Sequence, residues 1–447
     1  MKPINGVNGF SWKRIGVVKP DILLLLLPLL AGQLPAQPVI TTQPTNQIIV
    51  NGGNVVFNVA VSGTGPFTYQ WQFNGTNLPN NTITTVAGSS NIPLGDGGPA
   101  TNASLAGATG VAVDNAGVFY IADLDYNRIR KVDTNGIITT IAGNGSFSFS
   151  GDGDAATNAS LKMPFGVTMD SYGDFFIADT GNNRIRMVDT NGIITTVAGN
   201  GDARFSGDGG AATNASINTP CGVAVDGRGN LFIADYANNC IRIVDTNGII
   251  ATVAGNGGFS FSGDGGAATN ASLKDPQGIA VDAYGSLFIA DYQNNRIRRV
   301  DSYGIISIVA GNGTAYQSAG DGGPATNACL TNPTGVAVDS FGYLFIADWN
   351  NNRIRQVDPN GIITTVAGNG GGSYSGDGGS ATDGSLHQPV GVALDASGGL
   401  LIADQANSRI RRITLARLSQ PGGWRLVKPC KLVTALKRSP LHCRVWS

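Results

Sequence analysis

Short apolar runs separated by polar turns make up most of the chain between residues 82 and 415. In one stretch the runs are Gly222–Val225, Leu231–Ala234, Ile241–Val244 and Ile249–Ala254. Each has four to six residues and is rich in Val, Ile and Phe, which is typical of β-strands. Gly, Asn and Asp residues in Asp226–Asn230 and Asp245–Gly248 indicate tight turns. No helical period of useful length appears, so the pattern predicts an all-β chain.

The first of these runs recurs six times at a nearly constant spacing. Its copies begin 56, 56, 56, 57 and 56 residues apart, at Val111–Asp114, Val167–Asp170, Val223–Asp226, Ile279–Asp282, Val336–Asp339 and Val392–Asp395. This regularity indicates one four-stranded unit copied six times. Such a unit buries both faces only when neighbouring units pack radially against it. We therefore expect an all-β, six-bladed β-propeller with four-stranded blades.

The fourth strand of the unit is missing after the last copy and present before the first. It follows five copies, at Ile137–Gly143, Ile193–Gly199, Ile249–Gly255, Ile305–Gly311 and Ile362–Gly368. The sixth copy lacks it, whereas a matching segment, Ile83–Gly88, stands alone before the first copy. We predict that Ile83–Gly88 pairs with the third strand of the sixth blade, around Ser408–Ile413, and closes the ring.

The motifs of each copy resemble those of NHL repeats. The pattern G-V-A-V-D, L-F-I-A-D and N-N-R-I-R is matched by Gly335–Asp339, Leu344–Asp348 and Asn351–Arg355. The long insert containing G-D-G-G-x-A-T, as at Gly207–Thr213, is similar to the propeller of teneurin-like proteins. The resemblance covers residues 82–415 and implies a six-bladed propeller. It leaves the function open, because such propellers host ligand binding, protein binding and a few lyase or hydrolase activities.

The N-terminal segment, residues 1–36, is predicted to be a signal peptide. It has a basic start, the apolar run Ile22–Leu30, and a small residue at Ala36. The apolar run is too short to span a bilayer. We expect a secreted, periplasmic or cell-surface protein with no membrane span in the mature chain; an uncleaved membrane anchor is the alternative.

The propeller is flanked by two segments of different character. Residues 38–81 resemble part of an immunoglobulin-like domain, with Trp71 as its core tryptophan. The later strands of such a domain are missing, so we expect a partial module. Residues 416–447 carry seven basic and no acidic side chains. We expect a disordered basic tail there, with a partner-binding tail as the alternative.

Charge and cysteine content restrict the possible partners and covalent links. All 30 acidic residues are Asp, and residues 38–415 carry 29 acids against 18 bases, a net charge of −11. A surface of this sign argues against nucleic-acid binding. Cys221 and Cys240 are expected on strands two apart, which is too far for a disulfide, whereas Cys430 and Cys443 could pair.

Catalytic chemistry has little support in the sequence. The chain has two histidines, His387 and His442, and lacks Glu. A single propeller histidine cannot build a three-histidine zinc site, and we expect His387 to be a loop residue. The G-D-G-G aspartates are predicted to cap turns, with calcium binding as the alternative; they are Asp96, Asp152, Asp208, Asp264, Asp321 and Asp377. We expect no catalytic residue, no metal site and no other cofactor.

Polar residues at the hairpins between the second and third strands form the candidate site. Long links between blades should emerge on the same side as these hairpins, where recognition is common. The candidate ligand-binding residues are Asp123, Asp179, Asp235, Asp291, Asp348, Asp404, Asn183, Asn239, Asn295 and Asn352. The structural alternative is a cross-strand ion pair, such as Asp179 with Arg184. Cys240 replaces this arginine in the third blade, as a tolerated change or the mark of a site.

The expected function is therefore an exported, non-catalytic NHL-type propeller that binds a protein or a glycan. Asp and Asn side chains suit hydroxyl-rich or cationic ligands better than anions. A lyase or lactone hydrolase acting at the channel mouth is the first alternative, and a purely structural cell-envelope module is the second. The sequence does not identify the ligand or the oligomeric state.

Overall fold

The computed structural model describes residues 81–89, 94–315 and 318–415, together with five strands outside this range. The chain divides into two compact units, one made of Met1–Asn80 with Ala416–Ser447 and the other of Asn81–Leu415. The predicted signal peptide lies outside the described residues, as does a possible Cys430–Cys443 bond. Within the described part of the chain, no helix is long and apolar enough to cross a membrane.

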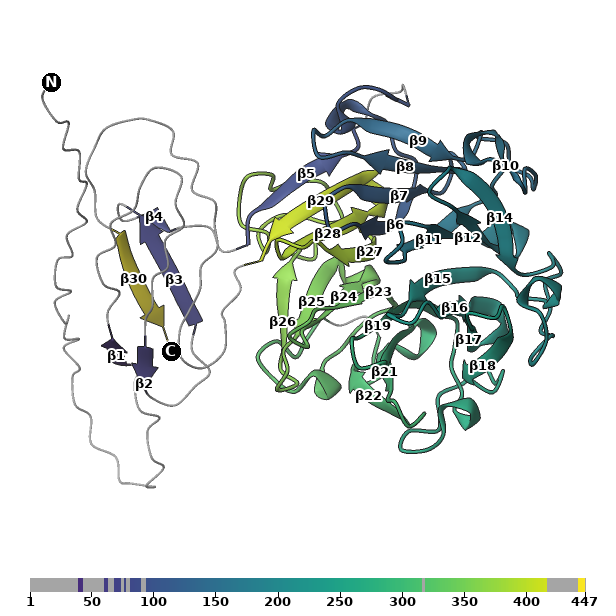
Figure 1. Ribbon diagram of the computed structural model, residues 1–447. Coiled ribbons are helices and arrows are strands. Elements are labelled where there is room, and N and C mark those ends of the chain that lie inside the picture. Colours follow the sequence, from purple (N-terminus) through teal and green to yellow (C-terminus); the bar gives the residue numbers. More distant parts are fainter. Residues whose placement is uncertain are drawn as a thin grey trace, which may run out of the picture. The chain divides into compact units, whose positions relative to one another are not determined.

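The larger unit is a six-bladed propeller, which confirms the predicted architecture (Figure 1). Blade 1 contains β6 (Ala108–Val113), β7 (Phe119–Asp123), β8 (Arg128–Val132) and β9 (Ile138–Ala142). Blade 2 contains β11 (Pro164–Met169), β12 (Phe175–Asp179), β13 (Arg184–Val188), β14 (Ile193–Ala198) and a short outer strand, β10 (Asp154–Ala155). Blade 3 contains β15 (Pro220–Val225), β16 (Leu231–Asp235), β17 (Cys240–Val244) and β18 (Ile250–Ala254).

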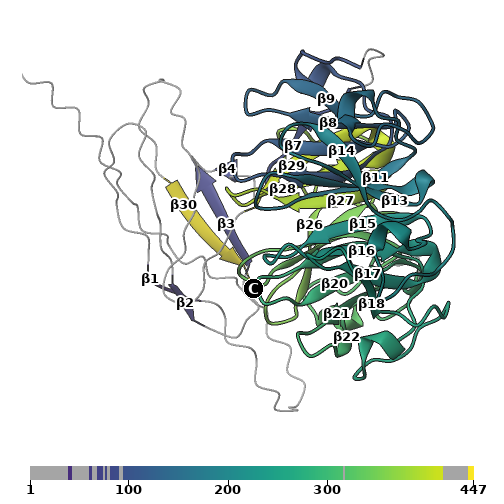
Figure 2. The same ribbon diagram turned by 45° about the vertical axis from the view of Figure 1, so that its right-hand side comes forward.

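The remaining blades repeat this antiparallel order. Blade 4 contains β19 (Pro276–Val281), β20 (Leu287–Asp291), β21 (Arg296–Val300) and β22 (Ile306–Ala310). Blade 5 contains β23 (Pro333–Val338), β24 (Leu344–Asp348), β25 (Arg353–Val357) and β26 (Ile363–Ala367). Blade 6 contains β27 (Pro389–Leu394), β28 (Gly399–Asp404), β29 (Arg409–Thr414) and β5 (Ile83–Ala87). Figure 2 shows the blades following one another from β9 to β22 in a turned view.

The ring is closed by the N-terminal strand of the propeller, as predicted. β5 pairs antiparallel with β29, and Ile83 lies opposite Ile413 while Ala87 lies opposite Ile410. In Figure 1 the purple-blue β5 lies beside the yellow-green β29, although the two are more than 300 residues apart. The pairing supplies the fourth strand of blade 6 and removes an open sheet edge.

The core consists of layers between neighbouring blades. Alternate side chains of the second strand point to opposite faces of the sheet. Every residue of β12 is buried, so both faces of this strand are covered. Phe175 and Ile177 pack in the layer shared with blade 1, whereas Phe176 and Ala178 pack in the layer shared with blade 3. This double burial explains why the L-F-I-A-D run is apolar throughout rather than alternating.

Glycines allow the first strands of adjacent blades to approach each other around the axis. A Cβ atom on Gly222 would collide with the backbone carbonyl of Gln277 in the next blade. The equivalent glycine of every blade meets the same obstacle; the other five are Gly110, Gly166, Gly278, Gly335 and Gly391. The invariant Gly of the G-V-A-V-D motif is therefore required by packing between blades.

Each long link between blades, called here an insert, covers the outer edge of the blade that follows it. In blade 2 the insert donates from the backbone N–H groups of Gly153 and Ala156 to the carbonyls of Ile194 and Gly192. The A-T-N run of the insert forms a 3₁₀ turn in five of the six inserts. These turns are η1 (Ala100–Asn102), η2 (Ala156–Asn158), η4 (Ala212–Asn214), η6 (Ala268–Asn270) and η8 (Ala325–Asn327). The insert thereby protects an otherwise exposed strand edge.

The smaller unit contains two short sheets. β1 (Val39–Thr42) pairs with β2 (Ala60–Ser62), and β3 (Thr68–Phe73) pairs with both β4 (Thr76–Asn77) and β30 (Leu441–Trp446). The end of the basic tail is therefore a strand paired with the segment that contains Trp71. The resemblance of residues 38–81 to an immunoglobulin-like domain stays a prediction.

Candidate functional site: the insert face

One face of the propeller is formed by the inserts and by the turns between second and third strands; we call it the insert face. Five of these turns are 3₁₀ turns, namely η3 (Thr180–Asn182), η5 (Tyr236–Asn238), η7 (Tyr292–Asn294), η9 (Trp349–Asn351) and η10 (Gln405–Asn407). In blade 2, Asn182 donates from Nδ2 to the carbonyl of Ser148 in the insert at 2.8 Å. Inserts and turns therefore meet on the same side, as the sequence predicted.

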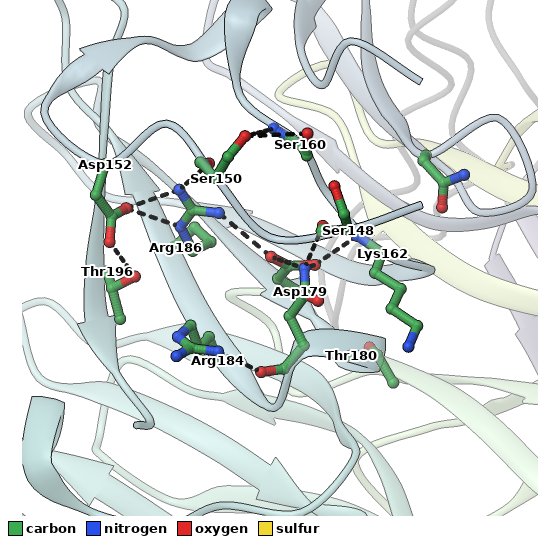
Figure 3. A network of polar contacts seen from close by, with 12 residues as sticks. Ser148, Ser150, Asp152, Ser160, Lys162, Asp179, Thr180, Arg184, Arg186 and Thr196 are labelled. Carbon is green, nitrogen blue, oxygen red and sulfur yellow. Dashed lines mark hydrogen bonds and ion pairs between the residues drawn. The ribbon is translucent and has the colours of Figure 1, made fainter. Parts of the chain in front are cut away.

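The aspartate that ends each second strand anchors the insert face from inside. Asp179 is fully buried, and its Oδ1 accepts the backbone N–H of Lys162 at 2.7 Å. Its two oxygens also accept from Nδ2 of Asn182 at 3.0 and 2.9 Å. Arg186, the third residue of β13, forms an ion pair with Asp179, and its Nη1 lies 3.3 Å from Oδ2 of the aspartate (Figure 3). All three donor groups belong to the protein itself, so the carboxylate has an internal structural role.

The buried arginine links this aspartate to the G-D-G-G loop. Nη2 of Arg186 lies 2.7 Å from Oδ1 of Asp152, and Oδ2 of Asp152 accepts from the hydroxyl of Thr196 at 2.7 Å (Figure 3). The Asp–Arg–Asp chain occurs in every blade: Asp123–Arg130–Asp96, Asp179–Arg186–Asp152, Asp235–Arg242–Asp208, Asp291–Arg298–Asp264, Asp348–Arg355–Asp321 and Asp404–Arg411–Asp377. The G-D-G-G aspartates thus bind arginine, which corrects the prediction that they only cap their own turns.

The predicted ion pair between Asp179 and Arg184 is wrong, because the aspartate pairs with a different arginine of the same strand. Asp179 and Arg184 do lie opposite each other in the register of β12 and β13. The guanidinium of Arg184 instead donates to the carbonyls of Asn182 and Asn200, at 2.9 and 2.8 Å. Arg184 also lies over the ring of Phe149, with Cζ 3.8 Å from the ring centroid. The first arginine of the R-I-R motif therefore holds the loops together, and the second pairs with the aspartate.

Burial dominates the ionisation of these aspartates. Loss of hydration raises the pKa of Asp179 to about 6, against the opposing effect of the donors from Asn182, Lys162 and Arg186. Burial likewise raises the pKa of Asp123, Asp235 and Asp291 to about 6. At neutral pH the carboxylates are ionised and pair with the buried arginines.

Each candidate asparagine connects its hairpin turn to the insert that follows the blade. Asn183 adopts the left-handed conformation at φ 53°, and its Oδ1 accepts the backbone N–H of Thr219 at 2.9 Å. The same side-chain oxygen of Asn239, Asn295 and Asn352 accepts from Asp275, Asn332 and Gln388 at 2.8–3.0 Å. Asn is suited to this position because it tolerates positive φ and supplies a short acceptor.

The structure therefore brings the ten candidate residues to one face but turns their polar atoms toward the chain's own groups. The six aspartates are fully buried, and the asparagines are buried or half-buried. Sequence reasoning missed the buried arginine at the centre of each Asp–Arg–Asp network, which is Arg186 in blade 2. A signal was present, because every R-I-R motif has a G-D-G-G aspartate 34 residues before its second arginine, as in Asp152 and Arg186.

Exposed aromatic side chains on the inserts were also missed. Phe147, Phe205 and Phe259 are more than half exposed, and Phe149, Phe261 and Tyr374 are somewhat less so. Lys162 Nζ lies 4.7 Å from the ring centroid of Phe147, and Lys274 Nζ lies 4.4 Å from that of Phe259. Each of these rings is supported on one face by a cation and leaves further surface exposed to solvent.

The central cavity offers different chemistry. It has a volume of about 310 Å³ and is lined by the first strands of all six blades. Its lining residues include no His, Asp, Lys or Arg, and burial raises the pKa of Cys221 far above its usual range.

His387 lies in the insert before blade 6, where its backbone N–H donates to Asp404. Among the described residues, no group of three or more potential ligands could hold a metal ion.

The fold and the insert face define a six-bladed propeller with long blade-connecting inserts. The description "Teneurin NHL domain" applies to the family model that matches residues 82–150, 146–206, 200–262, 260–318 and 312–373. Because these matches cover more than half of the chain, the protein belongs to the teneurin NHL domain family.

Similar proteins agree with this assignment. The chain is 29% identical to teneurin-1 of Mus musculus over 355 residues, which is 71% of this chain and 13% of the relative. It is 31% identical to teneurin-4 of Mus musculus over 334 residues, or 66% of this chain and 12% of that protein. An auxiliary nutrient binding protein from Bacteroides thetaiotaomicron shares the fold, with a TM-score of 0.56 at 15% identity over 81% of this chain and 95% of the other. The chain thus spans a small part of its teneurin relatives.

Proposed function

We propose that this protein is a non-catalytic recognition module that is exported and binds a protein or a glycan through its insert face. The observation that carries the proposal is the set of exposed, cation-supported aromatic rings on the inserts, above all Phe147 and Phe259. A ligand that covers an exposed aromatic ring removes apolar surface from contact with water, which favours binding. Aromatic side chains are accordingly enriched at binding sites.

The rest of the insert face supports this use. The Asp–Arg–Asp chains and asparagine links fix the inserts from below, so the rings project from a rigid base. A rigid base reduces the entropy lost on binding. The basic, apolar N-terminal segment of residues 1–36 supports export.

The test compares aromatic rings on the two faces of the propeller. The double variant Phe147→Ala with Phe259→Ala should lose at least tenfold of its binding to any ligand found on glycan and peptide arrays. Tyr172 and Tyr284 are exposed on turns between first and second strands, at the opposite face, and form the matched control. Replacing this pair with alanine should leave binding unchanged. Loss of binding in the tyrosine pair, with retention in the phenylalanine pair, would refute the proposal.

A further inference from the structure

Blade 3 lacks an arginine that joins two loops in blades 1, 2, 4 and 5. In blade 2, Arg184 bridges the carbonyls of Asn182 and Asn200. Equivalent bridges at 2.8–3.1 Å are made by Arg128, Arg296 and Arg353 in blades 1, 4 and 5. In blade 3 this position is Cys240, which is buried and places its Sγ 3.9 Å from Oδ2 of Asp235. The shorter side chain does not make the guanidinium bridge.

The groups that the arginine would bind are present in blade 3. The two corresponding carbonyls belong to Asn238 and Asn256, and among the described residues neither accepts a hydrogen bond. Space is open beside them, because a Cβ on Gly257 would meet only the Asn238 carbonyl, at 4.0 Å. A Cβ on the matching Gly201 of blade 2 would instead collide with the guanidinium of Arg184. We call this place, bounded by Cys240, Asn238, Asn256 and Gly257, the blade 3 notch.

An aromatic ring borders the notch. Phe205 occupies the position of Phe149, Phe261 and Tyr374, whose ring centroids lie 3.8–3.9 Å from the Cζ of the first arginine of the R-I-R motif. Among the cations of the described residues, only the second arginine, Arg242, lies over Phe205, with its Cζ 4.6 Å from the ring centroid. Phe205 is 52% exposed, whereas its three counterparts are 37–42% exposed. The extra exposure corresponds to the ring surface that an arginine covers in blades 2, 4 and 6.

The charge of the network also differs in blade 3. In blade 2 the carboxylates of Asp152 and Asp179 are matched by Arg184 and Arg186, so these four groups sum to zero. In blade 3, Asp208 and Asp235 are matched by Arg242 alone, which leaves a sum of −1. A bound cation would restore the balance found in blade 2.

We propose that the blade 3 notch binds the guanidinium group of an arginine side chain presented by a partner polypeptide. This inference rests on the proposed function, since it places a protein ligand on the insert face. A planar guanidinium can donate to two carbonyls while it stacks on an aromatic ring, which an ammonium group cannot do equally well. The notch is small, so a partner polypeptide gains affinity from additional contacts with the neighbouring inserts.

Calorimetric titration with a Gly-Gly-Arg-Gly-Gly peptide, capped at both ends, tests the inference. The same peptide with citrulline in place of arginine is the neutral, nearly isosteric control. The wild-type protein should bind the arginine peptide at least fivefold more tightly than the citrulline peptide. The Cys240→Ser variant should keep this preference, because it leaves the notch open.

The Cys240→Arg variant is the decisive comparison, because it places the protein's own guanidinium in the notch. It should weaken binding of the arginine peptide at least tenfold, and the arginine at this position in the five other blades indicates that the scaffold accepts it. Undiminished binding by a folded Cys240→Arg variant would overturn the inference. If that variant does not fold, Phe205→Ala provides the second measurement and should weaken binding several-fold; unchanged binding there would also overturn it.

The effect of Arg204, a cationic residue next to Phe205, on peptide binding needs a separate control. Arg204 is exposed and precedes Phe205, so Arg204→Ala should bind the arginine peptide at least as tightly as the wild type. Array binding that depends on Phe147 and Phe259 but is unaffected by Cys240→Arg would leave the proposed function standing and refute the notch alone.

Discussion

Arg186 reaches diagonally across its hairpin to Asp179, with an Nη1–Oδ2 distance of 3.3 Å, although its register partner in β12 is Ile177. Both side chains are fully buried, and the same diagonal pair occurs in all six blades. Diagonal neighbours on one face of a sheet are within reach of a long side chain such as arginine. The pair anchors each insert to its blade and underlies the first prediction.

Removing the buried arginine should destabilise the propeller strongly. Arg186→Met leaves the buried Asp179 and the half-exposed Asp152 without their cation, and we expect a loss of about 3–5 kcal/mol in unfolding free energy. Arg412→Ala is the control, because Arg412 pairs with Asp395 near the surface and should cost less than about 1 kcal/mol. Denaturant unfolding measures both; equal losses would contradict a structural role for the buried chain.

Closure of the ring should depend on the apolar side chain at the start of β5. Ile83 is fully buried opposite Ile413, so Ile83→Ala should cost about 2–5 kcal/mol and speed amide exchange in β29. Thr84→Ala changes an exposed neighbour in the same strand and should stay within about 0.5 kcal/mol of the wild type. Slow exchange in β29 of the Ile83→Ala variant would show that β5 does not hold the ring closed.

Two glycines of blade 3 should respond in opposite ways to alanine. Gly222→Ala puts a Cβ against the Gln277 carbonyl of the next blade and should destabilise by about 1–3 kcal/mol, since the strands must separate. A Cβ on Gly227 meets nothing within 4 Å, so Gly227→Ala should be neutral or stabilise by up to about 1 kcal/mol. Thermal unfolding of the two variants distinguishes them, and a neutral Gly222→Ala would refute the packing argument.

The buried aspartates should make stability fall as pH rises from about 4 to 6. A carboxyl group whose pKa is raised from 3.8 to about 6 binds more protons in the folded than in the unfolded chain. Its contribution is fully present below pH 3.8 and is lost as pH rises through about 6. Asp179→Asn should therefore flatten the pH dependence in this window, by up to about 3 kcal/mol.

An aspartate at the protein surface, Asp133, provides the control for this pH effect. A hydrogen bond from the backbone N–H of Ile137 holds the pKa of Asp133 below its usual value, so the contribution of Asp133 to stability changes only at lower pH. Asp133→Asn should leave the slope between pH 4 and 6 unchanged. Denaturation midpoints measured across this window test the prediction, and identical slopes for Asp179→Asn and the wild type would contradict it.

The sequence by itself determined the repeat, the strands and the closure of the ring. Each of these depends on local composition and on spacing: V-A-V-D copies 56 or 57 residues apart predict blades, and the isolated Ile83–Gly88 predicts its place beside Ser408–Ile413. It also predicted the hairpin register that sets Asp179 opposite Arg184 and Asp235 opposite Cys240.

Only the tertiary structure decided which groups meet at the insert face. Register gives Asp179 a neighbour in Arg184, but the inserts supply carbonyls that bind Arg184 and an aspartate, Asp152, that draws in Arg186. Sequence spacing does not fix these contacts, because they depend on how a long insert folds over the next blade. The same packing buries the candidate aspartates, exposes the insert phenylalanines and leaves the notch beside Cys240 open.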